Sequence, residues 1–385
     1  MTRVGIAVAA LLALLLLISP WQDENPKSGE STLRLAELMG AKQDVEGYLT
    51  ARPGPIFTFP KDHWQHQGYQ NEWWYLTANL HDRNNPDIRF GVQLTVFRFA
   101  LAADREEDAN PWLSPNMYMA HFAITHVADN QHRASERFSR QGPNLAGAKA
   151  MPQGDQSLAM TRIWLADWQL QSLTADDLFP MLLQAADGDK QIAASLSLKA
   201  VKPMVLQGEQ GFSRKNLEGG GSYYYSYPRL TIAGTLNWDK HEFEVSGEGW
   251  FDHEWSSNSL APYQAGWDWF SLQLQDGSEL MYYGFRNHDG SDGLKYLARI
   301  SAEGEKISLD TEQLDVTAVD QWHSPDGTVY PSGWRLKLPT QGLDLYIEPR
   351  VSDQLMDLSV RYWEGAVKVS GSHQGSGYVE LAGYK

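Results

Sequence analysis

The chain has 385 residues, a formal net charge of −16 at pH 7 and no cysteine. The negative charge argues against nucleic acid and anionic membrane surfaces as partners. The lack of cysteine excludes disulfides, thiolate chemistry and cysteine zinc sites. The length suffices for two ordinary domains with sizeable cores, and the 15 Trp, 17 Tyr and 13 Phe residues favour β-sheets, a large apolar pocket, or both.

The N-terminus has the pattern of an export segment. Arg3 is followed by an uncharged run from Val4 to Ile18 that is rich in Ala and Leu. Such a run is typical of a signal sequence and is short for a full membrane span. No Ala-x-Ala site follows it, so a cleaved signal peptide and an uncleaved anchor both remain open for residues 1–21. We expect an exported, periplasmic protein whose contact with the inner membrane is limited to residues 4–21, followed by a linker with a short helix over residues 22–52.

From residue 53 onward the sequence predicts an all-β protein. Short runs of alternating and aromatic residues, such as 73–80, 88–99 and 367–370, are broken by Gly, Pro, Asn and Asp turns. Strong helical periodicity is scarce. Many short strands with turn signals indicate antiparallel β-barrels or sandwiches. The polar stretch 102–116 is expected to be a long loop.

An internal repeat divides this β region. Residues 69–80 align without gaps on residues 263–274, with identical Tyr, Gln, Trp and closing Leu. Each copy leads to a hairpin and a second strand that carries an arginine, Arg98 in the first copy and Arg286 in the second. Self-similarity of this kind indicates repeated structural units. We therefore predict two related β-domains.

The predicted domain limits are residues 53–232 and 233–385. The aligned copies differ at one informative position, where Trp74 of the first copy corresponds to Asp268 of the second. If the halves share a fold, this change is a candidate for chemistry that one domain alone has gained. Drift at a solvent-facing position is the alternative.

Two acidic segments lie among aromatic residues on what should be strands. Phe251-Asp252-His253-Glu254-Trp255 is followed about a dozen residues later by Gly266-Trp267-Asp268-Trp269-Phe270. A carboxyl group beside Trp is poorly solvated, so its pKa is raised and it can act as an acid near neutral pH. The surrounding rings can stabilise a cation.

Strand alternation places Asp268 on the face opposite Trp267 and Trp269. Asp268 therefore needs rings from adjacent strands for burial, such as Tyr282 or those of the 223–225 Tyr triplet. For the Asp252 segment, the alternative to catalysis is a buried acid that pairs with an arginine such as Arg286 across strands.

Other chemistry-bearing patterns are weak. His121 and His253 are the histidines that we retain as acid–base candidates. The histidine spacings match no standard zinc template, so no metal or cofactor is expected. No Gly-x-Ser-x-Gly nucleophile elbow occurs. Tyr223 and Tyr225 share a strand face and could either line a cavity or pack between domains.

Several ordered motifs together resemble the AttH/hydroxyneurosporene synthase (carotenoid 1,2-hydratase) family, lipocalin-like proteins also called predicted secreted hydrolases. The resemblance covers nearly everything from Phe57 to Lys385. It implies two tandem lipocalin- or calycin-like antiparallel β-barrel domains packed together. The motifs are Phe59-Pro60-Lys61-Asp62-His63, Glu72-Trp73-Trp74-Tyr75, Ala120-His121-Phe122, Tyr223-Tyr224-Tyr225-Ser226-Tyr227-Pro228, Gly249-Trp250-Phe251-Asp252-His253-Glu254-Trp255, Gly266-Trp267-Asp268-Trp269-Phe270, Tyr362-Trp363-Glu364-Gly365 and Gly377-Tyr378-Val379-Glu380-Leu381-Ala382-Gly383-Tyr384.

One branch of this family hydrates the terminal double bond of acyclic carotenoids, where an Asp protonates the alkene, rings stabilise the carbocation and water adds. By resemblance Asp268 would be the proton donor. The catalytic candidates are Asp268, His253, Asp252 and Trp255. The substrate-binding candidates are Trp267, Tyr282, Tyr223, Tyr225, Trp73, Trp74, His121 and Arg286.

Three functions follow as hypotheses. The first is a cofactor-free hydratase or isomerase that acts on a long apolar isoprenoid, polyene or lipid, with Asp as general acid. The second is a non-catalytic carrier of a small apolar or amphipathic ligand that works with an envelope ABC transporter permease, because the AttH branch is often linked to such exporters. The third is a hydrolase in which Asp252 and His253 activate a water. The export segment favours a role in the envelope.

Overall fold

The computed structural model describes residues 33–34, 46–103, 114–142, 144–153, 158–175, 177–257 and 260–385. The expected signal segment lies outside the described residues, as do most of the linker and of the loop expected at 102–116. Within the described part of the chain, no helix is long and apolar enough to cross a membrane.

The first sheet has 13 strands, and its main path runs in the order β5-β4-β3-β2-β14-β13-β10-β9-β8-β7-β6, while β11 and β12 pair with β13. A short 3-10 helix, η1 (Lys61–His63), precedes it. The strands are β2 (Asn71–Asp82), β3 (Arg89–Ala100), β4 (Asn116–His126), β5 (Gln131–Arg140), β6 (Ala146–Gln153), β7 (Leu158–Leu165), β8 (Trp168–Ser172), β9 (Met181–Asp187), β10 (Ile192–Ala200), β11 (Val205–Leu206), β12 (Phe212–Arg214), β13 (Gly221–Trp238) and β14 (His241–Ser256).

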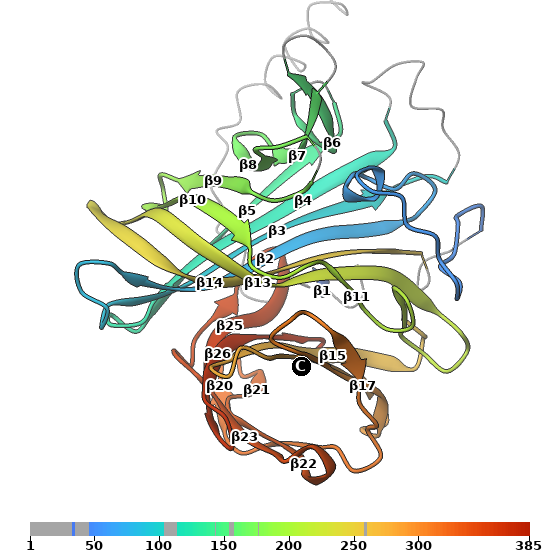
Figure 1. Ribbon diagram of the computed structural model, residues 1–385, viewed down its shortest axis with the longest axis vertical. Helices are drawn as coiled ribbons and strands as arrows, with labels where there is room; N and C mark the ends of the chain where they lie inside the picture. Colours follow the sequence, from blue (N-terminus) through green and yellow to red (C-terminus); the bar gives the residue numbers. More distant parts are fainter. Residues whose placement is uncertain are drawn as a thin grey trace, which may run out of the picture. The chain divides into compact units, whose positions relative to one another are not determined.

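The second sheet has 11 strands in the order β18-β17-β16-β15-β26-β25-β23-β22-β19, while β1 and β24 pair with β25 and β20 pairs separately with β21. Its strands are β1 (Leu33–Arg34), β15 (Gln264–Leu274), β16 (Glu279–Asn287), β17 (Asp292–Ile300), β18 (Lys306–Ser308), β19 (Asp315–Ala318), β22 (Trp334–Leu338), β23 (Leu343–Pro349), β24 (Leu355–Met356), β25 (Val360–Gly371) and β26 (Gly375–Ala382), with the 3-10 helix η3 (Pro339–Gln341) before β23. The separate pair is β20 (Gln321–His323) and β21 (Val329–Pro331). This sheet, orange to red in Figure 1, curves into a nearly closed barrel, whereas the first sheet forms a half-barrel.

The predicted fold class is confirmed, and the two sheets are built on one plan. The series β5-β4-β3-β2-β14-β13-β10-β9 corresponds strand by strand to β18-β17-β16-β15-β26-β25-β23-β22. The register agrees with the sequence repeat, because Glu72 lies opposite Arg98 just as Gly266 lies opposite Arg286. The two halves therefore share strand order and strand register.

The boundary between the halves differs from the predicted one. The limit expected between residues 232 and 233 falls inside β13, whose whole length belongs to the first sheet together with β14. The change of sheet comes between β14 and β15, at residues 257–263. The repeat in sequence begins at the first strand of each half, but the end of β13 and the whole of β14 belong to the first half although they lie beyond the expected limit.

Each barrel has its own packed interior. The first contains Trp74, Leu76, Phe122, Trp168 and Leu196 among many other buried residues. The second contains a set of leucines and aromatic rings on β15, β22, β23, β25 and β26. Both interiors come from the inward-facing half of an alternating pattern.

The segment that precedes β2 enters the first barrel and helps to fill it. The indole N–H of Trp74 donates to the carbonyl oxygen of His63, and the rings of Phe59 and His63 pack on Tyr225. His63 and Tyr225 are buried. The motif around residues 59–63 thus closes this part of the barrel.

A third cluster packs between the two sheets. It joins outward-facing rings of β2, β3 and β14, such as Tyr75 and Trp250, to rings of β15, β16 and β25, such as Trp269. Hydrogen bonds between the sheets accompany this packing. The amide of Gln273 donates to the carbonyl oxygens of Pro228 and Gly249 at 2.9 and 2.7 Å.

A buried charge network also joins the sheets. Glu279 on β16 accepts from Arg229 Nε on β13 at 2.6 Å and from Lys202 Nζ at 2.7 Å, and its side chain has no exposure. Arg229 also contacts Glu248, whose side chain is 41% exposed. Removing one partner of a buried network leaves uncompensated charge, whereas an exposed partner matters less.

We expect Glu279→Gln to lower the free energy of unfolding by about 3–5 kcal/mol, because it leaves buried Lys202 without its carboxylate and Arg229 with Glu248 alone. Glu248→Gln is the matched control, with an expected loss of about 0–1 kcal/mol. Urea denaturation of both variants measures the difference. Equal losses would show that the network does not stabilise the contact between the sheets.

Candidate functional site

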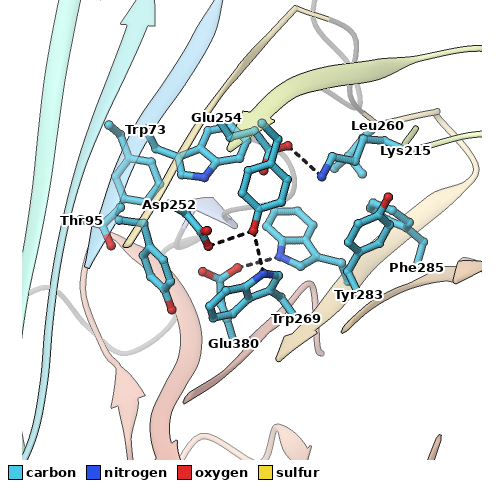
Figure 2. A pocket seen from close by; sticks show the side chains of 14 residues that line it. Trp73, Thr95, Lys215, Asp252, Glu254, Leu260, Trp269, Tyr283, Phe285 and Glu380 are labelled. Carbon is cyan, nitrogen blue, oxygen red and sulfur yellow. Dashed lines mark hydrogen bonds and ion pairs between the residues drawn. The ribbon is translucent and has the colours of Figure 1, made fainter. Parts of the chain in front are cut away.

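A pocket with about 680 Å³ of empty space, part of it open to solvent, lies between the two sheets. Figure 2 shows acidic and aromatic side chains from both sheets converging on it. It is lined by Trp73, Tyr75, Thr95, Phe97, Lys215, Tyr224, Asp252, Glu254, Leu260, Trp267, Trp269, Tyr283, Phe285 and Glu380.

Side-chain alternation brings these residues to one place. On β14, Asp252 and Glu254 point into the pocket, and on β15 Trp267 and Trp269 do the same. Trp73 of β2 lies opposite Glu254 in the ladder. Of the sequence candidates, Asp252, Trp267 and Trp73 therefore meet in this pocket.

Asp252 is buried and surrounded by hydrogen-bond donors. The Trp250 indole N–H donates to Oδ1 at 2.7 Å, the Ser226 hydroxyl donates to Oδ1, and the Tyr224 hydroxyl donates to Oδ2 at 2.9 Å. Burial nevertheless raises the pKa of Asp252 to about 7, against the effect of these donors. No cation contacts this carboxyl group among the described residues. It can exchange a proton near neutral pH.

Glu380 on β26 is the pocket's second titrating carboxyl group. Trp267 Nε1–H donates to its Oε1 at 2.6 Å. Burial raises the pKa of Glu380 to about 7, and the nearby carboxyl groups of Glu254 and Asp252 add to the increase. Glu380 keeps partial exposure because the pocket is open. Its environment fits a general acid that works near neutral pH.

Glu254 and Lys215 form the charged end of the pocket. Lys215 Nζ lies 2.8 Å from Glu254 Oε1, and the Ser222 hydroxyl donates to the same oxygen. The ammonium group also lies 4.5 Å from the centroid of the Tyr283 ring. Glu254 thus has the cation that Asp252 and Glu380 lack.

Asp268 lies elsewhere, on the face of β15 that points into the second barrel. Arg286 contacts its Oδ1, and the Tyr384 hydroxyl donates to it at 3.0 Å. Burial raises the pKa of Asp268, while the Arg286 guanidinium favours the ionised form. As predicted, the side chains of Asp268 and Trp267 point to opposite faces of β15. The role of proton donor beside those rings is not supported, because Asp268 is an ion-pair partner outside the pocket.

Two other substrate-binding candidates belong to this ion-pair region. Arg286 pairs with Asp268 and not with the Asp252 segment, for which an arginine partner was the alternative. Tyr282 packs close to Gly284, where an added Cβ would lie 2.2 Å from its hydroxyl oxygen. The charge of Asp268 raises the pKa of Tyr282 further above its usual value. Neither side chain lines the pocket between the sheets.

Five more candidates lie in the first barrel, on the faces of their strands opposite the pocket. They are His253, Trp255, Tyr223, Tyr225 and Trp74. The side chains of His253 and Asp252 point to opposite faces of β14. A water activated jointly by these two residues, as the hydrolase hypothesis required, is therefore contradicted.

His253 belongs to a buried hydrogen-bonded chain. Its Nε2 lies 2.8 Å from Glu72 Oε1, and its Nδ1 lies 2.9 Å from the Tyr225 hydroxyl. Glu72 Oε1 is also 2.7 Å from His66 Nδ1, and its Oε2 accepts from Arg98 at 2.7 Å. The Arg98 and His66 charges hold the pKa of Glu72 well below its usual range.

The ligand atoms of His66, Glu72 and His253 lie within 4.8 Å of one another, a set that could hold a metal ion. Each of these atoms already has a protein hydrogen-bond partner, and Arg98 occupies the other oxygen of Glu72. The geometry therefore fits a hydrogen-bonded network that fixes the 61–66 segment.

His121 lies between the sheets but away from the pocket. It is fully buried on β4, and its Nδ1 lies 2.9 Å from the Tyr362 hydroxyl on β25. Burial lowers the pKa of His121 to about 3, so the ring is neutral. Sequence reasoning placed it among ligand contacts, whereas the structure places it in a polar connection between the sheets.

Among the site residues that sequence reasoning missed are Glu380, Tyr224 and Lys215. Glu380 and Tyr224 lay within the motifs of the resemblance, but nothing local pointed to a role for Glu380. Its contact with Trp267 spans 113 residues. Only the pairing of β26 with β15 brings the two together.

The fold and this pocket define a lipocalin-like protein of two related sheets, a half-barrel and a nearly closed barrel, with an aromatic, acidic site between them. The family model described as AttH-like matches residues 50–384, so the chain belongs to the AttH-like family. The crystal structure of a candidate AttH protein from Nitrosomonas europaea is 30% identical, with a TM-score of 0.74 over 88% of this chain and 100% of that chain. Kievitone hydratase from Nectria haematococca is 15% identical, with a TM-score of 0.65 over 91% of this chain and 98% of that chain. At this identity the similarity supports a shared fold alone. No curated protein matches the chain.

The raised pKa of Glu380 makes stability depend on pH. The folded protein holds this proton more tightly than the unfolded chain, so stability is lost as pH rises from 4.5 through about 7. Glu380→Gln cannot ionise and keeps an acceptor for Trp267. We expect its free energy of unfolding, relative to wild type, to increase across this window by about 1–2 kcal/mol, a value reduced for partial exposure.

Urea denaturation at a series of pH values measures this effect. The exposed Glu312→Gln variant serves as the control and should track the wild type. Parallel stability curves for Glu380→Gln and wild type would contradict the raised pKa of Glu380.

Proposed function

We propose that this protein is a cofactor-free, hydratase-like enzyme that binds a long apolar isoprenoid, polyene or lipid in the pocket between the sheets. Glu380 is the proton donor in this proposal and takes the role that the sequence suggested for Asp268. The observation that carries it is a carboxyl group with a pKa near 7 in an aromatic pocket with no contacting cation of its own. The structural similarity to a hydratase agrees with this reaction class.

The proposed reaction is the addition of water to a carbon–carbon double bond. Glu380 transfers its proton to one alkene carbon, and the adjacent carbon becomes a carbocation. Trp73, Trp267 and Trp269 surround this position with π-faces, which stabilise a cation in a poorly hydrated site. A water molecule then adds to the cation and loses a proton to Asp252. The product is an alcohol, and one water is consumed.

The donor network around Asp252 suits the role of base. Three hydrogen-bond donors favour its ionised form, and burial opposes them, so the group exchanges protons near neutral pH. Glu380 has a pKa raised to the same value, about 7, but has one such donor, from Trp267, so its ionised form has less hydrogen-bond support. We assign Glu380 as the acid and Asp252 as the base on this difference in donors.

The carrier hypothesis shares the same pocket and is favoured by its largely aromatic lining. In that case the ligand would leave unchanged, for an envelope ABC transporter permease as partner. Periplasmic location and contact with the inner membrane through residues 4–21 belong to both proposals, because both place the protein where an apolar ligand passes between membranes.

Farnesol, an isoprenoid alcohol with trisubstituted double bonds, is a suitable probe for the first function. We expect the wild type to form a product heavier by one water and Glu380→Gln to lower turnover at least 100-fold, about the contribution of a general acid, while farnesol still binds. Mass spectrometry of the extracted product and native mass spectrometry of the complex measure the two effects.

Asp268→Asn is the matched control, because Asp268 lies outside the pocket and should affect stability more than turnover. Loss of turnover in Asp268→Asn with full turnover in Glu380→Gln would restore the role suggested by the sequence. Farnesol that is bound by wild type and both variants but never changed would favour the carrier.

A further inference from the structure

Glu364 on β25 is a carboxyl group that the proposed reaction leaves without a role. It lies directly opposite Glu380 in the β25–β26 ladder, and both side chains point between the sheets. Glu364 is 1% exposed, and neither of its carboxyl oxygens accepts a hydrogen bond. Two carboxyl groups in directly opposite positions cannot both be ionised at low cost.

The surroundings of Glu364 hold no cation in contact with it among the described residues. Tyr75 on β2, Tyr362 on β25, Tyr378 and Glu380 on β26 are the titratable groups around it. The hydroxyls of Tyr75 and Tyr362 favour its ionised form without reaching normal hydrogen-bond geometry. Burial and the charge of Glu380 outweigh them and raise the pKa of Glu364 well above its usual range. A fully buried, unpaired carboxyl group is stable only in its neutral form.

A row of polar groups, hydrogen-bonded between Tyr362 and His121, leads from Glu364 toward the surface. Tyr362, two residues along the same face of β25, lies 2.9 Å from His121 Nδ1. His121 Nε2 has no hydrogen-bond partner and lies 3.9 Å from Glu136 Oε2. Glu136 is 27% exposed, so a water between it and His121 would complete the row. This gives His121 a position between solvent and the pocket.

We propose that Glu364 is a proton-holding residue behind Glu380, which returns a proton to Glu380 after each transfer to substrate and is recharged through Tyr362 and His121. The proton balance is simple. Glu380 gives one proton to the alkene, and Glu364 gives one to Glu380 while it receives one from the Tyr362 hydroxyl. Solvent replaces that proton through His121, and Asp252 releases to solvent the proton that it takes from the adding water. The recharging role rests on the proposed hydratase function, whereas the proton on Glu364 does not. Glu364 acts through Glu380 and is a positioning residue.

Infrared spectroscopy of the wild type tests the proton directly. At a pH well above the titration of Asp252 and Glu380, one protonated carboxyl band should remain, and it should be lost in Glu364→Gln. Glutamine has the shape of the neutral acid, so this variant should fold with near wild-type stability. Absence of the band in wild type, or its persistence in Glu364→Gln, overturns the proposal.

Hydrogen–deuterium exchange of that band tests the route, and it remains available even if Glu364→Gln does not fold. Tyr362→Phe interrupts the row toward His121, and we expect it to slow exchange by about 10-fold or more. Tyr75→Phe removes the other neighbouring hydroxyl and should leave the exchange rate near that of wild type. Equal rates in wild type and Tyr362→Phe overturn the route.

Turnover of farnesol separates this inference from the proposed function. We expect Glu364→Gln to lower kcat by about 10-fold or more with little change in KM, because substrate contacts are intact. Wild-type kcat in Glu364→Gln overturns the recharging role while the hydratase function stands. If wild-type protein hydrates nothing, the proposed function and the recharging role fail, and the infrared result still decides whether Glu364 holds a proton.

Discussion

Side-chain alternation along the strands that face both a barrel and the other sheet is the constraint on which the site depends. On β14, Asp252 and Glu254 face the pocket while His253 and Trp255 face the first barrel. A shift of one residue in the register would exchange these sets. The polar chemistry is thereby divided into two compartments that touch through the backbone of one strand and share no side chain.

The position of cations, and not burial alone, decides which carboxyl groups can carry a proton at neutral pH. Glu72 is fully buried, yet Arg98 and His66 hold its pKa well below the usual range. Glu364 is as deeply buried and has no such partner, so its pKa moves the other way. Equal desolvation with different partners therefore produces an anchoring ion pair in one place and an acid in another.

Much of the architecture could be predicted from the sequence. The strand pattern gave the all-β class, and the aligned copies gave two halves with one plan. The boundary at residue 232 was wrong because β13 pairs with β14 and β14 pairs with β2, and this long-range pairing leaves no local signal. The pocket was predicted only in part, since Asp252, Trp267 and Trp73 lie in strong motifs. Glu380 enters it through long-range pairing, which residue spacing does not encode.

The repeat also explains why Asp268 was a misleading candidate. Arg98 in the first half takes Glu72 as partner, and the position equivalent to Glu72 in the second half is Gly266. Arg286 there finds its carboxylate two residues later, at Asp268. The change from Trp74 to Asp268 therefore accompanies the loss of a carboxylate at Gly266 and keeps each arginine paired.

The surface between the sheets, which both halves form, suits the proposed hydration. Each barrel interior must be packed and its polar groups satisfied for the barrel to be stable. The surface between the sheets is less constrained by packing and by hydrogen bonding, so it can keep an open pocket and carboxyl groups with few partners. An alkene cation needs a dry wall of rings, and its proton donor needs a high pKa; both conditions follow from burial without a contacting cation. Glu380 and Glu364 are poor anchors because no cation contacts them, and for the same reason they are suitable to hold and deliver a proton.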